Sequence, residues 1–178
     1  AVRALGVEIV CRSDSPLVES FERSIVAAKA MNDDICAFET RWSVQNLHDE
    51  HPGKLSPAAI KKCERGWKLT LDDYRQRLLE RDEARRRLAA IAPVGDALIS
   101  LASAGPAPVN EPGSARPTGE ATFNHPSSSL GTPAVTVPLM AVGGMPVGVQ
   151  IMGQQHDDER VTAIARWLAA GVAPVTVD

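Results

Sequence analysis

The chain has 178 residues, 44% of them hydrophobic, and a formal net charge of −3. That length allows one domain with its own core, and so small a charge gives no reason to expect a nucleic acid or an anionic membrane as partner. The apolar runs fall well short of the ~20 residues of a membrane span, and we expect no signal peptide.

The first residues predict the end of a helix followed by a strand. Residues 1–5 fit a last helical turn, Gly6 fits its C-terminal stop, and residues 7–11 fit a strand. The sequence begins with Ala1 rather than methionine. We therefore expect that the chain was cut from a longer protein or trimmed at its start.

A helical segment is predicted over about residues 15–92. It begins at Ser15 and Pro16, an N-cap followed by the residue favoured at the first helical position. Apolar residues at helical spacing extend the first helix to about residue 47, with a break at residues 32–34 as the alternative. The predicted apolar face consists of Leu17, Val18, Phe21, Ile25, Ala28, Ile35 and Trp42.

Two further helices are predicted in this segment. The first covers about residues 57–65, and Gly66 ends or kinks it. Thr70 and Asp73 fit a capping box at the start of a helix that runs to about residue 91. The buried side of this helix is expected to hold Leu71, Tyr74, Leu78, Leu88 and Ala92.

Three consecutive arginines, residues 85–87, lie near the end of this last helix. They could contact a nucleic acid, but Glu80, Asp82 and Glu83 directly precede them and nearly cancel their charge. We therefore predict a solvated helix face with ion pairs between residues four apart.

Two short apolar strands are predicted towards the C-terminal end. Residues 133–139 and 147–152 contain several β-branched residues, and the second run alternates along its length. Residues 141–146 between them, with Gly143 and Gly144, are typical of a turn. The residues expected in the core are Val135, Val137, Val149 and Ile151.

Three other elements surround these strands. A short strand is predicted at residues 97–101 and an irregular, proline-rich loop at residues 105–117. Acidic residues at 157–159 fit the start of a final helix, which Gly171 ends. Its predicted buried stripe consists of Val161, Ile164, Ala165, Leu168 and Ala169.

The two strands carry a resemblance to a known family. Residues 130–138 read LGTPAVTVP, and residues 144–153 read GMPVGVQIMG. They resemble the C-terminal signature of the amidase signature family, a G-x-P-A-x-x-x-P strand followed by G-L-P-V-G-x-Q-x-x-G. Residues 96–99 and 105–108 resemble the D-A-L-L and P-A-P parts of a block upstream of that signature.

The resemblance implies an α/β fold, part of a three-layer α/β/α arrangement with a mixed sheet. It also implies an enzyme that hydrolyses carbon–nitrogen amide bonds through an acyl-enzyme on a serine, aided by a second serine and a lysine. In the family these residues lie upstream, in and before a Gly-Ser-rich segment that this sequence does not contain. We therefore expect residues 1–178 to form the C-terminal portion of an amidase-like domain. That portion should have no catalytic residue, metal or cofactor, and it should be inactive alone.

A third match concerns the substrate pocket. The T-G-E at residues 118–120, followed by Phe123 and Asn124, resembles a T-G-D…F-N segment of some members. We expect Phe123, Asn124, Ser127 and Ser128 to line the pocket of the intact enzyme. The serines could be mistaken for nucleophiles, but no spacing pairs them with a histidine, so a loop that caps the following strand is expected. Some members have asparagine at the position of Ser128, so the role of that asparagine does not carry over.

The remaining candidates for metal binding are histidines and cysteines. His48 and His51 flank two acidic residues in a predicted loop, where solvated side chains are expected rather than a metal site. Cys11, Cys36 and Cys63 are odd in number and widely spaced, which indicates neither a disulfide framework nor a metal site. The expected compartment is the cytoplasm.

Two functions remain open from the sequence. In the first, the chain is a C-terminal fragment of an amidase-like hydrolase. Its partners are then a small-molecule amide in the intact enzyme and either the N-terminal half or a second copy of the chain. In the alternative, the chain is a stand-alone truncated homologue that serves as a binding or structural subunit. The predicted signature strands contain no charge that would blunt a free edge, so we expect the isolated chain to associate through them.

Overall fold

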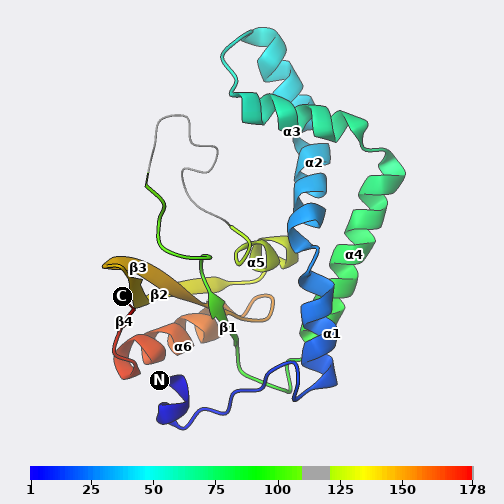
Figure 1. Cartoon of the computed structure of the whole chain (residues 1–178). Coiled ribbons are helices and arrows are strands. Elements are labelled where there is room, and N and C mark those ends of the chain that lie inside the picture. The colour runs from blue at the N-terminus through cyan, green and yellow to red at the C-terminus, as the bar shows by residue number, and fades with distance from the viewer. Residues whose placement is uncertain (110–120, 178) are drawn as a thin grey trace.

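The computed structural model describes residues 1–109 and 121–177 and shows a helical arm beside a small sheet (Figure 1). The helical arm consists of α1 (Pro16–Ile25), α2 (Ala28–Glu50), α3 (Pro57–Lys68) and α4 (Leu71–Ala90). The sheet half consists of β1 (Leu98–Leu101), β2 (Ala134–Val142), β3 (Met145–Met152), α6 (Asp158–Gly171) and β4 (Val175–Val177). A 3-10 turn, η1 (Val2–Leu5), opens the chain, and the short α5 (His125–Leu130) lies between the two halves.

In the part of the chain that the structure describes, no helix combines the length and apolar character needed to cross a membrane.

The first predicted helix is divided into α1 and α2 at Val26 and Ala27, not at residues 32–34. Asp33 and Asp34 stay inside α2 because their carboxylates have partners. Asp33 accepts from Lys29 one turn earlier (2.8 Å), and Asp34 binds arginines of α3 and α4. These contacts outweigh the low helix propensity of aspartate.

Gly66 lies inside α3 rather than at its end, because α3 continues to Lys68. The glycine is buried against α2, and a Cβ at this position would overlap the backbone carbonyl of Ala37. The absence of a side chain therefore allows α2 and α3 to approach closely. The predicted stop was wrong, since the residue serves helix packing instead.

α4 has the predicted capping box. The Asp73 N–H donates to Thr70 Oγ1 (3.1 Å), and the Thr70 N–H donates to Asp73 Oδ2 (2.9 Å). Leu88 is buried as predicted, whereas Leu71 and Ala92, at the two ends of the helix, are exposed. The core side of α4 is thus confined to its second half.

Arginines 85–87 form ion pairs as predicted, but only Arg87 pairs at the predicted spacing of four residues, and the other two pair at three. Their guanidinium groups lie between 2.7 and 3.5 Å from Asp82 or Glu83. In addition, Arg85 Nε donates to the backbone carbonyl of Leu130 (2.9 Å). This arginine therefore also connects α4 to α5.

The four strands form one mixed sheet in the order β1-β3-β2-β4. β3 is antiparallel to β1 and to β2, whereas β2 is parallel to β4. The turn between β2 and β3 contains only Gly143 (φ 54°) and Gly144 (φ 76°). Glycine adopts these positive φ values without strain, and they suit a two-residue hairpin. The predicted α/β fold with a mixed sheet is confirmed, and the hairpin strands are longer than predicted.

The signature strands are central in this sheet and not at its edge, contrary to our expectation. β2 lies between β3 and β4, and β3 lies between β1 and β2, so that β1 and β4 are the edge strands of the described sheet. Pro138 lies within β2, where pairing with β3 changes register between Val137 and Met140. Such an irregularity is where a strand tolerates a residue that has no N–H.

The two faces of the sheet pack against different helices, because neighbouring residues of a strand point to opposite faces. Ile151 points to the face that α6 covers, and Met152 points to the face that meets α5, α1 and α4. The cluster at α6 consists of Val137, Leu139, Ile151, Val161, Ala165, Leu168 and Val172. The second cluster consists of Val18, Phe21, Ala84, Leu88, Ile91, Leu130 and Met152. Helices therefore lie on both faces, as in a three-layer arrangement.

The predicted core of the hairpin is confirmed in part. Val137 and Ile151 are buried, whereas Val135 and Val149 are only half-buried and pack at the margin of the α6 cluster. The predicted buried residues of α6 are also confirmed in part. Three of the five are buried, whereas Ile164 is half-buried and Ala169 is exposed.

Two predictions of local structure were wrong. Residues 7–11 form no strand, because the Cys11 N–H donates to Asp14 Oδ2 (2.8 Å) and starts a turn there. The serine run at residues 127–129 is not a loop but part of α5. The match at residues 118–120 and most of the predicted loop 105–117 lie outside the described residues.

Candidate substrate-binding segment

The candidate residues Phe123, Asn124, Ser127 and Ser128 lie in and just before α5. This helix follows Asn124, has proline in its first turn and ends at Gly131, which has a positive φ of 68°. The N–H groups of Gly131 and Thr132 both donate to the carbonyl of Ser127 (2.9 and 3.1 Å). A glycine that can adopt this left-handed conformation therefore ends the helix, and β2 begins three residues later at Ala134.

The four candidates differ in exposure. Asn124 and Ser128 are exposed, Phe123 is half-buried and Ser127 is buried. Ser128 is one residue from Ser127 along a helix, so the two side chains point in different directions. Asn124 and Ser128 are thus the members of the set that can present an amide and a hydroxyl group to a ligand.

The buried serines of α5 are bonded to backbone carbonyls. Ser127 Oγ donates to the carbonyl of Asn124 (3.0 Å), and Ser129 Oγ donates to the carbonyl of Ala28 on α2 (3.3 Å). A serine nucleophile instead needs a base that accepts its proton. These two hydroxyls therefore stabilise α5 and its contact with α2.

Gln150 holds the entry to α5, a role that the sequence analysis missed. Its side chain is buried in β3, and its Nε2 donates to the carbonyl of Phe123 (3.0 Å) and to Ser100 Oγ (3.4 Å). Ser100 and Thr136 are its partners in register on β1 and β2, so three polar residues lie side by side across the sheet. A glutamine between the apolar Val149 and Ile151 was the available signal, since a buried amide needs partners.

A second pair of side chains holds the other end of α5. Arg85 Nε on α4 and Gln155 Nε2 after β3 both donate to the carbonyl of Leu130 (2.9 Å each). An orphan carbonyl at the end of a helix is thereby satisfied twice. The candidate segment is thus fixed to the sheet at its start and to α4 at its end.

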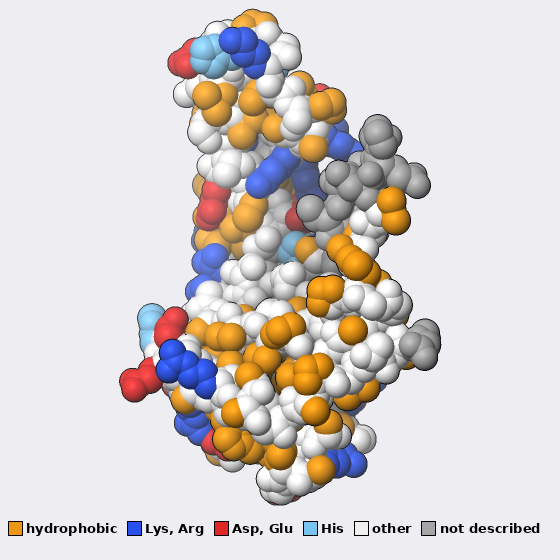
Figure 2. All heavy atoms as spheres, turned by 90° about the vertical axis from the view of Figure 1, so that its left-hand side faces the viewer, with side chains coloured by type: hydrophobic (Ala, Val, Ile, Leu, Met, Phe, Trp, Pro, Cys, Tyr) orange, Lys and Arg blue, Asp and Glu red, His pale blue; other side chains and the backbone are white. Residues whose placement is uncertain are grey.

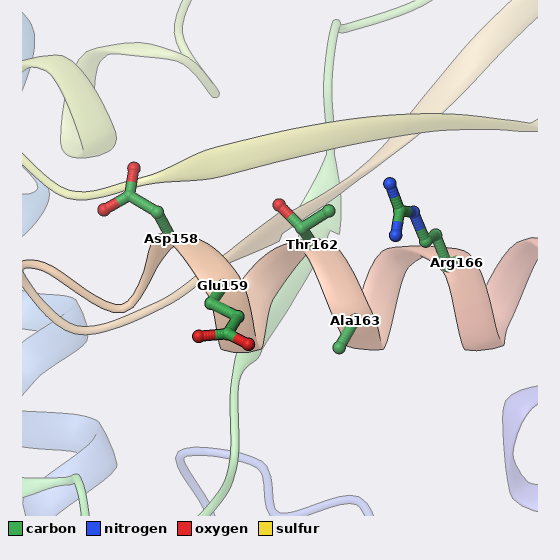
Figure 3. Close-up of a pocket in the computed structure, with 5 residues that line it drawn as sticks. All are labelled: Asp158, Glu159, Thr162, Ala163 and Arg166. Carbon is green, nitrogen blue, oxygen red and sulfur yellow. The ribbon is translucent and has the colours of Figure 1, made fainter.

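A shallow depression on the outer side of α6 lies apart from this segment (Figure 3). Its lining residues all belong to α6, which packs on the face of Ile151, whereas Gln150 and Phe123 lie on the opposite face. The residues are Asp158, Glu159, Thr162, Ala163 and Arg166. The depression therefore contributes nothing to the candidate segment.

The histidines considered for metal binding lie at the far end of α2. His48 Nδ1 is 3.4 Å from Asp49 Oδ1, and His51 ends the helix. Among residues 1–109 and 121–177, no three histidine, cysteine or acidic side chains are grouped so that they could hold a metal ion.

Comparison with known proteins agrees with the fold and with the motif. No family model matches the chain. A glutamyl-tRNA(Gln) amidotransferase subunit from Pseudothermotoga lettingae is 48% identical over 44 residues, which are 25% of this chain and 9% of that protein. A solved amidase is 28% identical with a TM-score of 0.74, and the match covers 84% of this chain and 36% of that enzyme.

A third relative shows the same fold at lower identity. It is a bacterial aryl acylamidase of the amidase signature family, 19% identical with a TM-score of 0.58, matched over 90% of this chain and 40% of that enzyme. The matches thus span well under half of the length of each of these three proteins. In motif and in fold, the chain is thus similar to enzymes of the amidase signature family.

Proposed function

We propose that the chain is part of an amidase-like hydrolase that cleaves carbon–nitrogen amide bonds through a serine acyl-enzyme. The two serines and the lysine of that reaction would be supplied by a segment outside this chain. One observation carries the proposal. The two strands that match the family signature are the central strands of a sheet similar to that of a solved amidase, within a match that covers 84% of the chain.

The contribution of this chain would be to the substrate pocket. Asn124 and Ser128, both exposed on a segment held at each end, would bind the amide substrate by hydrogen bonds. Phe123 would supply an apolar wall, and Ser127 would support Asn124 through its hydrogen bond to the Asn124 carbonyl. Rigid support of this kind favours a pocket that is formed before the substrate binds.

The partner that completes the enzyme would pair with an edge of the sheet. β1 and β4 are the edge strands of the described sheet, and neither contains a charged residue. Exposed apolar residues on these strands and on the hairpin support an interface. They are Ile99, Met145, Val175 and Val177. On the face of the molecule that Figure 2 shows, hydrophobic side chains are spread over the sheet half. We propose the N-terminal half of the enzyme as this partner, in the cytoplasm, where the three free cysteines would stay reduced.

Complementation tests this function. The chain would be assayed against aliphatic and aromatic amides alone and together with a separately expressed N-terminal half. We expect no turnover above the buffer blank for the chain alone and measurable turnover for the mixture. Turnover by the chain alone that disappears when Ser127, Ser128 and Ser129 are all changed to alanine would contradict the proposal. A stable but inactive complex would contradict it as well.

The same material separates the alternative, a stand-alone binding or structural subunit. Light scattering after size exclusion should show a chain of 19.0 kDa in complexes with itself or with the added half. A monomer at high concentration that binds no hydrophobic dye and does not bind the added half would favour the stand-alone function instead.

A further inference from the structure

Three arginines of α4 lie on the side of this helix that faces α2 and α5. Arg77, Arg81 and Arg85 are four residues apart and therefore share one helix face. Arg77 Nε donates to Asp34 Oδ2 on α2 (2.9 Å), and Arg85 Nε donates to the carbonyl of Leu130 on α5 (2.9 Å). Arg81, one turn from each, consequently faces the corner between α2 and α5.

Arg81 differs from its two neighbours in its partners. The acidic residues beside it in the sequence are engaged elsewhere, Glu80 with Arg77 (2.8 Å) and Asp82 with Arg85 (3.5 Å). Its side chain is partly buried, and its Nε is fully buried without a hydrogen-bond partner among residues 1–109 and 121–177. Because removing a charged donor from water is costly unless an acceptor replaces the water, this guanidinium is suited to an anionic acceptor.

Two aromatic side chains stack between α2 and α4 on the side of Arg81 that is away from Arg85. Tyr74 lies two turns before Arg81 on the same face of α4 and stacks on Phe38 of α2, with 4.5 Å between the ring centroids. The Tyr74 hydroxyl donates to Glu39 Oε1 (2.7 Å). This hydrogen bond, followed by burial, raises the pKa of Tyr74, and the charge of Arg81 opposes the shift.

We propose that Arg81 binds the carboxylate of a small ligand in the corner formed by α2, α4 and α5. The planar fork of a guanidinium donates two parallel hydrogen bonds to a carboxylate, which gives orientation as well as affinity. α5 contributes the Leu130 carbonyl to this corner and also carries the candidate pocket residues. The inference rests on the proposed function in one respect, since it makes the substrate of the intact enzyme an amide that also bears a carboxylate.

Binding of malonate to the 178-residue chain tests the site without any measurement of turnover. The probes are malonate, its uncharged analogue malonamide, and inorganic phosphate, each titrated while the arginine Nε–H resonances are followed by NMR. We expect malonate to shift the Arg81 resonance, malonamide to shift none, and phosphate to bind more weakly than malonate. Arg81→Met should lower malonate affinity by about tenfold or more, and Arg81→Lys should lie between the two.

Arg86→Met is the matched control, because Arg86 is an exposed arginine of the same helix that pairs with Glu83 (2.7 Å). It should leave malonate affinity unchanged. Equal binding of malonate and malonamide, tighter binding of phosphate, or unchanged affinity in Arg81→Met would overturn the proposal. If Arg81→Met does not fold, the Arg81 resonance of the parent chain and the Arg81→Lys variant decide in the same way.

The result is independent of hydrolysis, because malonate contains no bond that the enzyme could cleave. Malonate binding through Arg81 without complementation would support the carboxylate site and contradict the proposed function. Complementation without malonate binding would contradict the carboxylate site alone.

Discussion

Different interactions stabilise the helical arm and the sheet half. In the arm, the buried Asp34 of α2 binds Arg65 of α3 (2.6 Å) and Arg77 of α4 (2.9 Å). In the sheet half, Ile151 and its apolar neighbours pack against α6 without any charged group. Charge pairs depend on geometry and are weakened by solvent, whereas apolar burial scales with area. The two halves should therefore respond to different substitutions.

The largest loss is expected from Ile151→Ala in the sheet half. Ile151 of β3 is fully buried in the cluster at α6, so truncation removes buried methyl groups and leaves a cavity. The free energy of unfolding should fall by about 2–5 kcal/mol in urea titrations. Hydrogen exchange should accelerate in β2, β3 and α6 more than in α2 and α3.

Ile99→Ala is the matched control for this variant. Ile99 is the β1 partner of Ile151 in register, yet 47% of it is exposed. Its truncation should cost about 1 kcal/mol or less. Equal losses in both variants, or equal acceleration of exchange in both halves, would show that the two halves do not differ as described.

The next effect is expected from Gly66→Ala in the arm. The added Cβ would overlap the backbone carbonyl of Ala37, which cannot move as a flexible side chain could. Although alanine favours a helix by about 1 kcal/mol, overpacking should lower the free energy of unfolding by about 1–3 kcal/mol. Circular dichroism during urea unfolding measures the loss.

Gly95→Ala is the control, since a Cβ there meets nothing within 4 Å. It should leave stability unchanged or raise it slightly. A Gly66→Ala variant that is stabilised in the same way would mean that α2 and α3 are not in close contact at this point.

The same comparison explains which elements the sequence predicted. The hairpin was predicted nearly in full because alternation, β-branching and the Gly143–Gly144 turn are all local signals. The function of Gly66 was not predictable, because it depends on Ala37, 29 positions earlier in the sequence. The break at Val26 and Ala27 has no glycine or proline to mark it.

The candidate segment shows the same limit. α5 had a usable signal in Pro126 and Gly131, but its six residues are too short for a periodic pattern. That Gln150 would hold the Phe123 carbonyl follows only from the register of the sheet. Likewise, which arginine of α4 has no acidic partner among the described residues depends on helix packing and not on the charge pattern along the chain.

A smaller effect is expected from Asp34→Asn, which tests the polar contacts of the arm. Asparagine keeps the shape but loses the charge that pairs with Arg65 and Arg77. Because these arginine side chains are 43% and 35% exposed, solvent will stabilise them in part, and the loss should be about 1–2 kcal/mol. Asp33→Asn, at a more exposed acid, should cost less. An Asp34→Asn variant as stable as the parent at low and high salt would show that the pairs contribute nothing to the arm.

The smallest effect is expected at the capping box of α4, and it should depend on pH. The hydrogen bond from the Thr70 side chain, followed by that from the Thr70 N–H, lowers the pKa of the Asp73 carboxyl group in the folded chain. A lowered folded pKa means that the contribution is complete above the unfolded carboxyl pKa of about 3.9 and is lost as the pH falls through the folded value. Asp73→Asn should therefore be less stable than the parent at pH 7, and the difference should vanish in strong acid.

Asp72→Asn is the matched control because the side chain of Asp72 is 92% exposed, and this variant should differ little from the parent at either pH. Urea unfolding of the three chains from pH 7 downwards measures this, and a difference between Asp73→Asn and the parent that stays constant with pH would contradict the role of the carboxylate in the cap.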